Sequence, residues 1–245
     1  MTTHANRPSP VVVNGHEINT LLFDTMGTIV DVDGSIKERL TQVLARYDHI
    51  DIDAIAAQWD RHIRTAMDDV NRKREKWQPH RTLRLNALEK LIDTKKIPPL
   101  TELERKELVS VIDTLKPWPD SPDALAELGV RTKIVAFSNA DFAELAALSK
   151  NGGLRWHAVI SAELANAYKP HPTMYQTAVD LLHLDRARSM VVAAHPWDLR
   201  AASEAGMLTA YIARPFTEAP EPEDNFTVTA ADLSAFCNEL AFGSS

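Results

Sequence analysis

Apolar runs and helical spacing follow one another along the chain, and together they predict its elements. Residues 19–23 (NTLLF) form a short apolar run that leads directly into Asp24 and Gly27, which indicates a buried strand followed by a tight turn. Asp24 is therefore expected at the carboxyl end of a strand.

A helical spacing of apolar residues fills the next part of the chain. It runs over residues 36–47 and 55–70, and leucines continue it over residues 83–91. We therefore expect residues 34–116 to be all-helical, with no good strand among them.

Strand-like runs alternate with helices in the last part of the chain. A proline-dense segment, residues 116–122 (KPWPDSP), comes first and favours a domain boundary, because proline removes a backbone donor and restricts the residue before it. We expect strands over residues 133–137, 158–160, 190–194 and 209–212, and helices over residues 141–148, 172–182 and 199–205. This alternation implies parallel strands with helical crossovers, and hence a doubly wound α/β sheet that includes the first strand.

Two domains are expected from this order of elements. Residues 11–33 and 117–245 would form an α/β core domain, and residues 34–116 an inserted all-helical domain. A chain of 245 residues, 44% of them hydrophobic, is long enough for one large and one small domain.

The charge of the chain narrows the class of partner. A formal net charge of −7 argues against a surface that neutralises nucleic acid phosphates, and the basic run at residues 72–76 has acidic neighbours and suits a solvated helix face. No segment approaches the length of a membrane span. We expect a small-molecule partner, no nucleic acid and no membrane, and leave open whether the chain forms a homodimer.

A cytoplasmic location is expected on two grounds. The single cysteine, Cys237, cannot form an internal disulfide, and residues 1–10 lack the apolar core of a secretion signal. Both observations fit a reducing compartment.

Polar residues follow the ends of several predicted strands. These residues are Asp24, the pair Ser138 and Asn139, Lys169, and the segment from His195 to Asp198. Ligands of open parallel sheets bind just beyond the carboxyl ends of the strands. The sequence therefore predicts a ligand site at this edge of the sheet.

Each of these residues also has a purely structural explanation. Asp24 suits a turn, Ser138 and Asn139 precede a segment with the spacing of a capping box, and Asp198 suits the start of a helix. Their joint placement favours chemistry. Two carboxylates at one sheet edge need a nearby cation to stay ionised together, and Lys169 is well suited to that role.

Four phrases of the sequence resemble the motifs of the haloacid dehalogenase (HAD) superfamily. They are DTMGT at residues 24–28, FSNA at 137–140, YKPHP at 168–172 and AHPWD at 194–198. Within that superfamily, the longer phrases KPHPTMYQTA and AAHPWDLRAASEAGMLTAYIARP resemble the type II (S)-2-haloacid dehalogenases. The resemblance implies a Rossmann-like core with a helical cap domain.

The resemblance further implies a hydrolase that acts on carbon–halide bonds. It would convert small 2-haloacids to 2-hydroxyacids through an aspartyl ester on Asp24. Lys169 would neutralise Asp24, Thr28 would support the loop that carries it, and Asp198 would help to position the hydrolytic water. The expected substrate contacts are Ser138, Thr25 and Met26 at the carboxylate, Asn139 at the leaving halide, and Tyr175, His195 and Trp197 elsewhere in the site.

Two positions depart from the pattern of the phosphatases in the superfamily. Met26 stands where they carry a second aspartate as general acid and base, and a thioether cannot transfer that proton. Ala194 stands where the first aspartate of a Mg²⁺ site would fall. We therefore expect no metal and no other cofactor. A HAD phosphatase, another HAD hydrolase of different substrate, and a catalytically silent carboxylate-binding protein remain as alternatives.

One departure concerns the dehalogenases themselves. Well-studied members carry an arginine for the departing halide in a phrase like Trp-Arg, whereas this chain has Trp59, Asp60 and Arg61. Because a carboxylate facing the halide would raise the barrier, we expect Arg61 or Arg64 to serve instead, or the substrate to differ. The family tends to carry a serine-rich fourth motif that includes an asparagine, and His195 stands in that motif here. His195 would donate a hydrogen bond, act as a base, or simply pack.

Overall fold

A six-stranded parallel sheet forms the centre of the computed structural model, which describes residues 11–242. The strand order is β10-β9-β8-β3-β6-β7, and every neighbouring pair is parallel. The strands are β3 (Thr20–Phe23), β6 (Lys133–Ser138), β7 (Ala158–Ser161), β8 (Ser189–Ala193), β9 (Leu208–Ile212) and β10 (Val228–Ala230). Their carboxyl ends therefore meet at one edge, with the first strand in the interior of the sheet.

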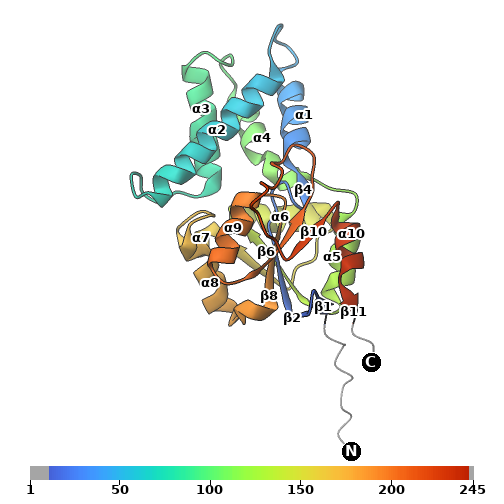
Figure 1. Ribbon diagram of the computed structural model, residues 1–245. Helices are drawn as coiled ribbons and strands as arrows, with labels where there is room; N and C mark the ends of the chain where they lie inside the picture. Colours follow the sequence, from blue (N-terminus) through green and yellow to red (C-terminus); the bar gives the residue numbers. More distant parts are fainter. Residues whose placement is uncertain (1–10, 243–245) are drawn as a thin grey trace, which may run out of the picture.

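Helices cover both faces of this sheet (Figure 1). They are α5 (Ser121–Gly129), α6 (Phe142–Gly152), α7 (Ala162–Ala165), α8 (Pro172–Leu182), α9 (Pro196–Glu204) and α10 (Leu233–Glu239). Because both faces are buried, the strands are continuous apolar runs. The predicted doubly wound α/β class is confirmed.

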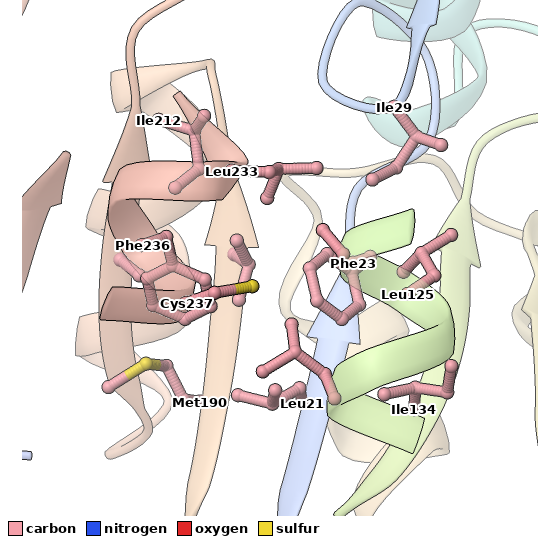
Figure 2. Packing of buried hydrophobic residues seen from close by; sticks show 14 of the residues in the cluster. Leu21, Phe23, Ile29, Leu125, Ile134, Met190, Ile212, Leu233, Phe236 and Cys237 are labelled. Carbon is pink, nitrogen blue, oxygen red and sulfur yellow. The ribbon is translucent and has the colours of Figure 1, made fainter. Parts of the chain in front are cut away.

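Alternate residues of β3 pack on opposite faces of the sheet. Leu21 and Phe23 lie in one apolar cluster with α5 and α10, where Phe236 is also buried (Figure 2). Leu22 lies in a second cluster, on the side of α8 and α9. The alternation follows from the period of two in a strand, and it fixes the direction in which the chain leaves β3 at Asp24.

A small antiparallel sheet lies at the opposite end of the core from the helical segment (Figure 1). It contains β1 (Val11–Val13), β2 (His16–Ile18) and β11 (Ala241–Phe242). Asn14 and Gly15, both with positive φ, join β1 to β2, which is the turn that suits a two-residue hairpin. We did not predict this sheet, nor β10 and α10.

The inserted segment is helical, with four α-helices and one short 3₁₀ turn. These are α1 (Val32–Leu44), α2 (Ile52–Asn71), α3 (His80–Asp93), α4 (Glu102–Val109) and η1 (Ser110–Thr114). The four α-helices share an apolar cluster, with Leu40, Trp59 and Leu88 buried in it, whereas Val111 and Ile112 of η1 pack in the cluster of the core. Two very short strands, β4 (Val30–Asp31) and β5 (Lys116–Pro117), pair where the chain leaves and rejoins the core.

The boundaries differ slightly from the expected segment of residues 34–116. The first helix begins at Val32, because the carboxylate of Asp31 accepts from the amide of Gly34 at 2.9 Å and caps it. Lys116 belongs to β5 rather than to a helix. Within residues 11–242, no helix has the length and apolar character to cross a membrane.

The core caps helix α3 from a distant part of the chain. Pro79 precedes α3 and makes no side-chain cap, so the amides of His80 and Arg81 donate to Asp141 at 2.7 and 3.1 Å. Arg84, one turn further, is buried and pairs with Glu144 of α6. Asp141 and Glu144, which have the spacing of a capping box, therefore also join the helical segment to the core.

Candidate active site

Asp24 directly follows β3, and its carboxylate is held by two donors. Its backbone amide still donates to the carbonyl of Val192 at 2.9 Å, so the residue continues the line of the strand. Oδ1 accepts from Lys169 Nζ at 2.8 Å and Oδ2 from Thr28 Oγ1 at 2.7 Å. Thr28 Oγ1 accepts in turn from the amide of Ala194 at 2.8 Å. The carboxylate is only slightly exposed, and its orientation is fixed.

Lys169 lies between two buried carboxylates. Its ammonium is 2.8 Å from Asp24 Oδ1 and 2.5 Å from Asp198 Oδ2, and it sits over the ring of Phe137. Burial acts to lower the pKa of Lys169, but the charges of Asp198 and Asp24 raise that pKa by more. The ammonium therefore stays charged and offsets both carboxylates.

Asp198 is fully buried at the start of α9. Its Oδ1 accepts from the hydroxyl of Tyr175 at 2.5 Å, while Oδ2 accepts from Lys169. Burial raises the pKa of Asp198, Lys169 lowers it and Asp24 raises it, with a net upward shift. Burial and Asp198 together raise the pKa of Tyr175 well above its usual value, so Tyr175 remains a donor.

Ser138 is the last residue of β6 and Asn139 follows it, but the two side chains face different surroundings. Asn139 lines the cavity, and both parts of its carboxamide bind the backbone of Lys169: Oδ1 accepts from the amide at 2.7 Å and Nδ2 donates to the carbonyl at 3.3 Å. Ser138 is fully buried, accepts from the amide of Ala140 at 3.2 Å and does not line the cavity. Ser138 therefore supports the helix entrance through its bond to Ala140, and its contact with a substrate stays a prediction.

His195 packs against the turn that carries Asp24. Its Nε2 lies 3.0 Å from the carbonyl of Met26 and 3.8 Å from Asp24 Oδ2, and its ring stacks on Trp197. The turn approaches it closely, since a Cβ on Gly27, whose φ is +82°, would lie 3.0 Å from Nε2.

Glu218 completes this group and was not predicted. Its Oε2 lies 3.4 Å from His195 Nδ1. Burial lowers the pKa of His195, but Glu218 and Asp24 raise it, and the net shift is upward. The hydrogen bond to His195 lowers the pKa of Glu218 to about 2. No motif marks Glu218, because it lies in a long loop after β9.

A cavity of about 540 Å³ opens between the sheet edge and helices α1 and α2. Asp24, Asn139, Lys169 and His195 contribute polar groups to it. Most of the other lining is apolar, with Met26, Ile36, Ile63, Met67, Trp118, Trp197 and Phe216 among its residues. Thr25, Thr28, Tyr175 and Asp198 lie behind the lining residues. The lining also includes the charged or polar residues Asp31, Asp33, Asp60, Arg64, Asp68, Asn71, His80, Arg84 and Thr217. A concave site with apolar walls and several polar groups suits a small polar organic ligand.

The structure changes the expectation for the cationic residue of α2. Arg61 is exposed and does not line the cavity, whereas Asp60 and Arg64 both do. One helical residue turns the side chain by about 100°, so Arg61 points away, while the i and i+4 positions share a face. Arg64 Nε donates to Asp60 Oδ2 at 2.6 Å. Of these two arginines, Arg64 lines the cavity and Arg61 does not; Lys169 and Arg84 are further cations of the lining.

The site does not fit a Mg²⁺ ion. Such an ion needs several oxygen ligands, but Lys169 stands between Asp24 and Asp198 and occupies an oxygen of each. Met26 and Ala194 add no side-chain oxygen. Across residues 11–242, no group of three or more His, Cys, Asp or Glu side chains is arranged to hold a metal ion.

Comparison with known proteins gives a consistent result. The family model described as haloacid dehalogenase-like hydrolase matches residues 18–206. Haloacetate dehalogenase H-2 of Moraxella sp. (strain B) is 31% identical over 124 residues, which are 48% of this chain and 55% of that protein. The (S)-2-haloacid dehalogenase of Xanthobacter autotrophicus is 31% identical over 115 residues, 46% of this chain and 45% of that protein. The chain thus spans about half the length of these curated relatives.

Solved structures match over nearly the whole chain. The defluorinating L-2-haloacid dehalogenase Rha0230 superposes with a TM-score of 0.86 at 28% identity, covering 95% of this chain and 99% of that one. The L-2-haloacid dehalogenase PA0810 gives a TM-score of 0.83 at 28% identity, covering 91% and 98%.

Proposed function

Because the chain belongs to the haloacid dehalogenase-like hydrolases, we propose that it cleaves the carbon–halogen bond of small 2-haloacids and releases 2-hydroxyacids. The observation that carries this proposal is the buried Asp24 carboxylate, held by Lys169 and Thr28 at the edge of the cavity. Met26 lines that cavity and offers no proton-transfer group.

The proposed reaction has two steps at Asp24. A carboxylate oxygen attacks the carbon that bears the halogen, forms an ester, and the halide leaves with the electron pair of the broken bond. Water then attacks the carbonyl carbon of the aspartyl ester, so that the 2-hydroxyacid is released, a proton passes to solvent and the carboxylate is restored. A covalent intermediate divides one difficult displacement into two easier steps.

The residues around Asp24 have distinct proposed roles. Lys169 and Thr28 orient the carboxylate and keep it ionised, as their hydrogen bonds of 2.8 and 2.7 Å support. Asp198 acts mainly through Lys169, because both of its carboxylate oxygens are already occupied by Lys169 and Tyr175. Any help to the hydrolytic water from Asp198 therefore passes through that ammonium.

The substrate contacts are proposed on the cavity side of the same turn. The amide of Met26, which lines the cavity, holds the substrate carboxylate, and Arg64, the one of the two expected arginines that lines the cavity, lies beside the departing halide. The guanidinium of Arg64 pairs with the carboxylate of Asp60, and both side chains are about half exposed. His195 Nε2 donates to the carbonyl of Met26 and Nδ1 faces Glu218, so His195 acts by fixing the turn that carries Asp24.

We propose the helical segment, expected over residues 34–116, as a cap domain over the core of residues 11–33 and 117–245. Its separate apolar cluster supports this division, as does the contribution of α1 and α2 to the cavity wall. The cap excludes bulk water from Asp24, which strengthens the charge interactions there.

A halide-release screen tests the proposed function. Purified protein would be offered 2-chloro, 2-bromo and fluoro acids, with Asp24→Asn as the inactive variant and Asp68→Asn as its matched control. Asp68 also lines the cavity, but its carboxylate pairs with Arg72 at 2.9 Å. We expect halide from wild type and Asp68→Asn only. Phosphate release from an aryl phosphate without any halide release would overturn the proposal.

A further inference from the structure

Two asparagines hold the backbone that carries Lys169, and they come from opposite sides. Asn139, in the core, binds the amide and carbonyl of Lys169 at 2.7 and 3.3 Å. Asn71, the last residue of α2, binds the amide and carbonyl of Tyr168 at 2.9 Å each. Each carboxamide satisfies one donor and one acceptor of a single residue, as a neighbouring strand would.

The helical segment also encloses the side chain of Tyr168. The ring is fully buried, its hydroxyl donates to the carbonyl of Gln78 at 2.5 Å, and Trp77 packs against it at 4.8 Å between ring centroids. The segment from Asn71 to Gln78 therefore binds Tyr168 through both its backbone and its side chain, although 97 residues separate Asn71 from Tyr168.

The position of Lys169 matters because its ammonium serves two buried carboxylates at once. Buried ions lose their hydration, and their mutual attraction offsets that loss only when the geometry is close to ideal. A shift of the Tyr168 backbone moves the Cα of the next residue, and the ammonium cannot then keep 2.8 Å to Asp24 and 2.5 Å to Asp198 together. The backbone contacts of Asn71 oppose such a shift.

We propose that Asn71 is a positioning residue for the reaction at Asp24. It acts through Tyr168 to fix the backbone from which Lys169 reaches its two carboxylates. The cap then contributes to the catalytic centre as well as covering it. The last residue of its helix α2, Asn71, binds Tyr168, which is the neighbour of Lys169. This inference rests on the proposed function for its kinetic consequences.

The kinetic test compares Asn71→Ala with Asn86→Ala. Asn86 is an exposed residue of helix α3 in the cap, and its Nδ2 donates only to the side chain of Gln78, at 3.1 Å. We expect Asn71→Ala to lower kcat about tenfold, a barrier change of about 1.4 kcal/mol, with little change in KM. The pH profile of kcat/KM should change, because the ammonium that offsets two buried carboxylates is displaced. Asn86→Ala should change neither quantity.

Crystal structures of the two variants separate this inference from the proposed function. In Asn71→Ala we expect Lys169 Nζ to lose hydrogen-bond distance to Asp24 or Asp198, whatever the substrate. An unchanged Lys169 geometry, or an unchanged pH profile in a variant that has only lost thermal stability, would overturn the role of Asn71. Absence of halide release by the wild type would instead overturn the proposed function and leave the structural comparison to decide on Asn71.

Discussion

The charges of Asp24, Lys169 and Asp198 are shielded from water, and each depends on the others. Side-chain exposure is 5% for Asp24, 1% for Lys169 and 0% for Asp198. In such surroundings the loss of one charge leaves the others uncompensated. The two functions of Lys169, in folding and in catalysis, can therefore be separated by pH.

We predict that Lys169→Met lowers kcat by about 100-fold or more, because Asp24 loses the cation that keeps it ionised and oriented. The variant should also be less stable at neutral pH, where two buried carboxylates lack a cation. Burial raises the pKa of Asp198, and the substitution removes the cation that lowers it, so the stability deficit should shrink as pH falls and Asp198 becomes protonated. Thermal unfolding and halide release would be measured from pH 4.5 to 8. Recovery of activity together with stability at low pH would contradict the catalytic role.

Arg64 and Arg61 provide a second comparison between neighbouring residues. Arg64→Ala should lower kcat/KM by about tenfold, roughly 1.4 kcal/mol of barrier, because it removes a cation at the cavity. Arg61→Ala should leave kcat/KM unchanged, since Arg61 is exposed and outside the cavity lining. Steady-state halide release measures both. A larger loss in Arg61→Ala than in Arg64→Ala would show that the proposed contact is wrong.

The sequence was informative about the segments that leave the carboxyl ends of strands: Asp24 and Asn139 directly follow β3 and β6, and Lys169 follows β7 after the short helix α7. It was less informative about residues that reach the site from elsewhere. Asp24, Asn139 and Lys169 could be placed at one edge because parallel strands end there. Glu218 could not, since its contact with His195 depends on the path of a loop. The choice between Arg61 and Arg64 stayed open because the buried face of a helix is not known from its sequence alone.

At the scale of elements, the strands of the sheet that are buried on both faces were the easiest to predict. Their unbroken apolar runs come from burial on both sides. β10, with three residues, is too short for such a run. The start of α3 was equally hard to predict from the sequence. The residue that caps it, Asp141, lies 61 positions from His80 and belongs to the core.

The ion pair of Arg84 and Glu144 should be the main polar contribution to docking of α3 on the core. Glu144→Gln would leave a buried guanidinium without its carboxylate, so we predict a loss of about 3–5 kcal/mol in the free energy of unfolding. Arg46→Met, which breaks a solvent-accessible pair with Glu104, should lower the free energy of unfolding far less. Urea unfolding measures both losses. Similar values for the two variants would contradict the assignment.

The pH dependence of that pair has a definite sign. Burial raises the pKa of Glu144, but His80 and Arg84 lower it by more, to about 2. A carboxyl group whose pKa is lower in the folded state stabilises the fold above its unfolded pKa of 4.5. That contribution should be lost as pH falls from about 4.5 to about 2 in wild type, and be absent from Glu144→Gln.

For the whole molecule, the class and the insertion of a helical segment followed from the order of elements, but the contacts between the two parts did not. The order of strands in the sheet and the docking of Asn71 on Tyr168 depend on long-range packing, for which a single sequence carries no local signal. The cavity arises from these same contacts, so its lining from α1 and α2 could only be described from the structure.

We predict that catalysis is independent of added divalent metal, since Lys169 occupies the place between the carboxylates that a Mg²⁺ ion would need. Halide release after extensive dialysis against a chelator should equal that of untreated protein, and added Mg²⁺ should not raise it. Activity that is lost to the chelator and restored by Mg²⁺ would contradict this reading of the site.

The covalent ester on Asp24 is the central claim, and a single turnover in ¹⁸O-labelled water tests it most directly. With protein in excess over an accepted 2-haloacid, water attacks the aspartyl carbonyl, so the label should enter the Asp24 carboxylate and the first 2-hydroxyacid should be unlabelled. Mass spectrometry of the product and of the peptide that contains Asp24 gives both values. Label in the product of the first turnover, with none in Asp24, would contradict the mechanism and indicate direct attack by water.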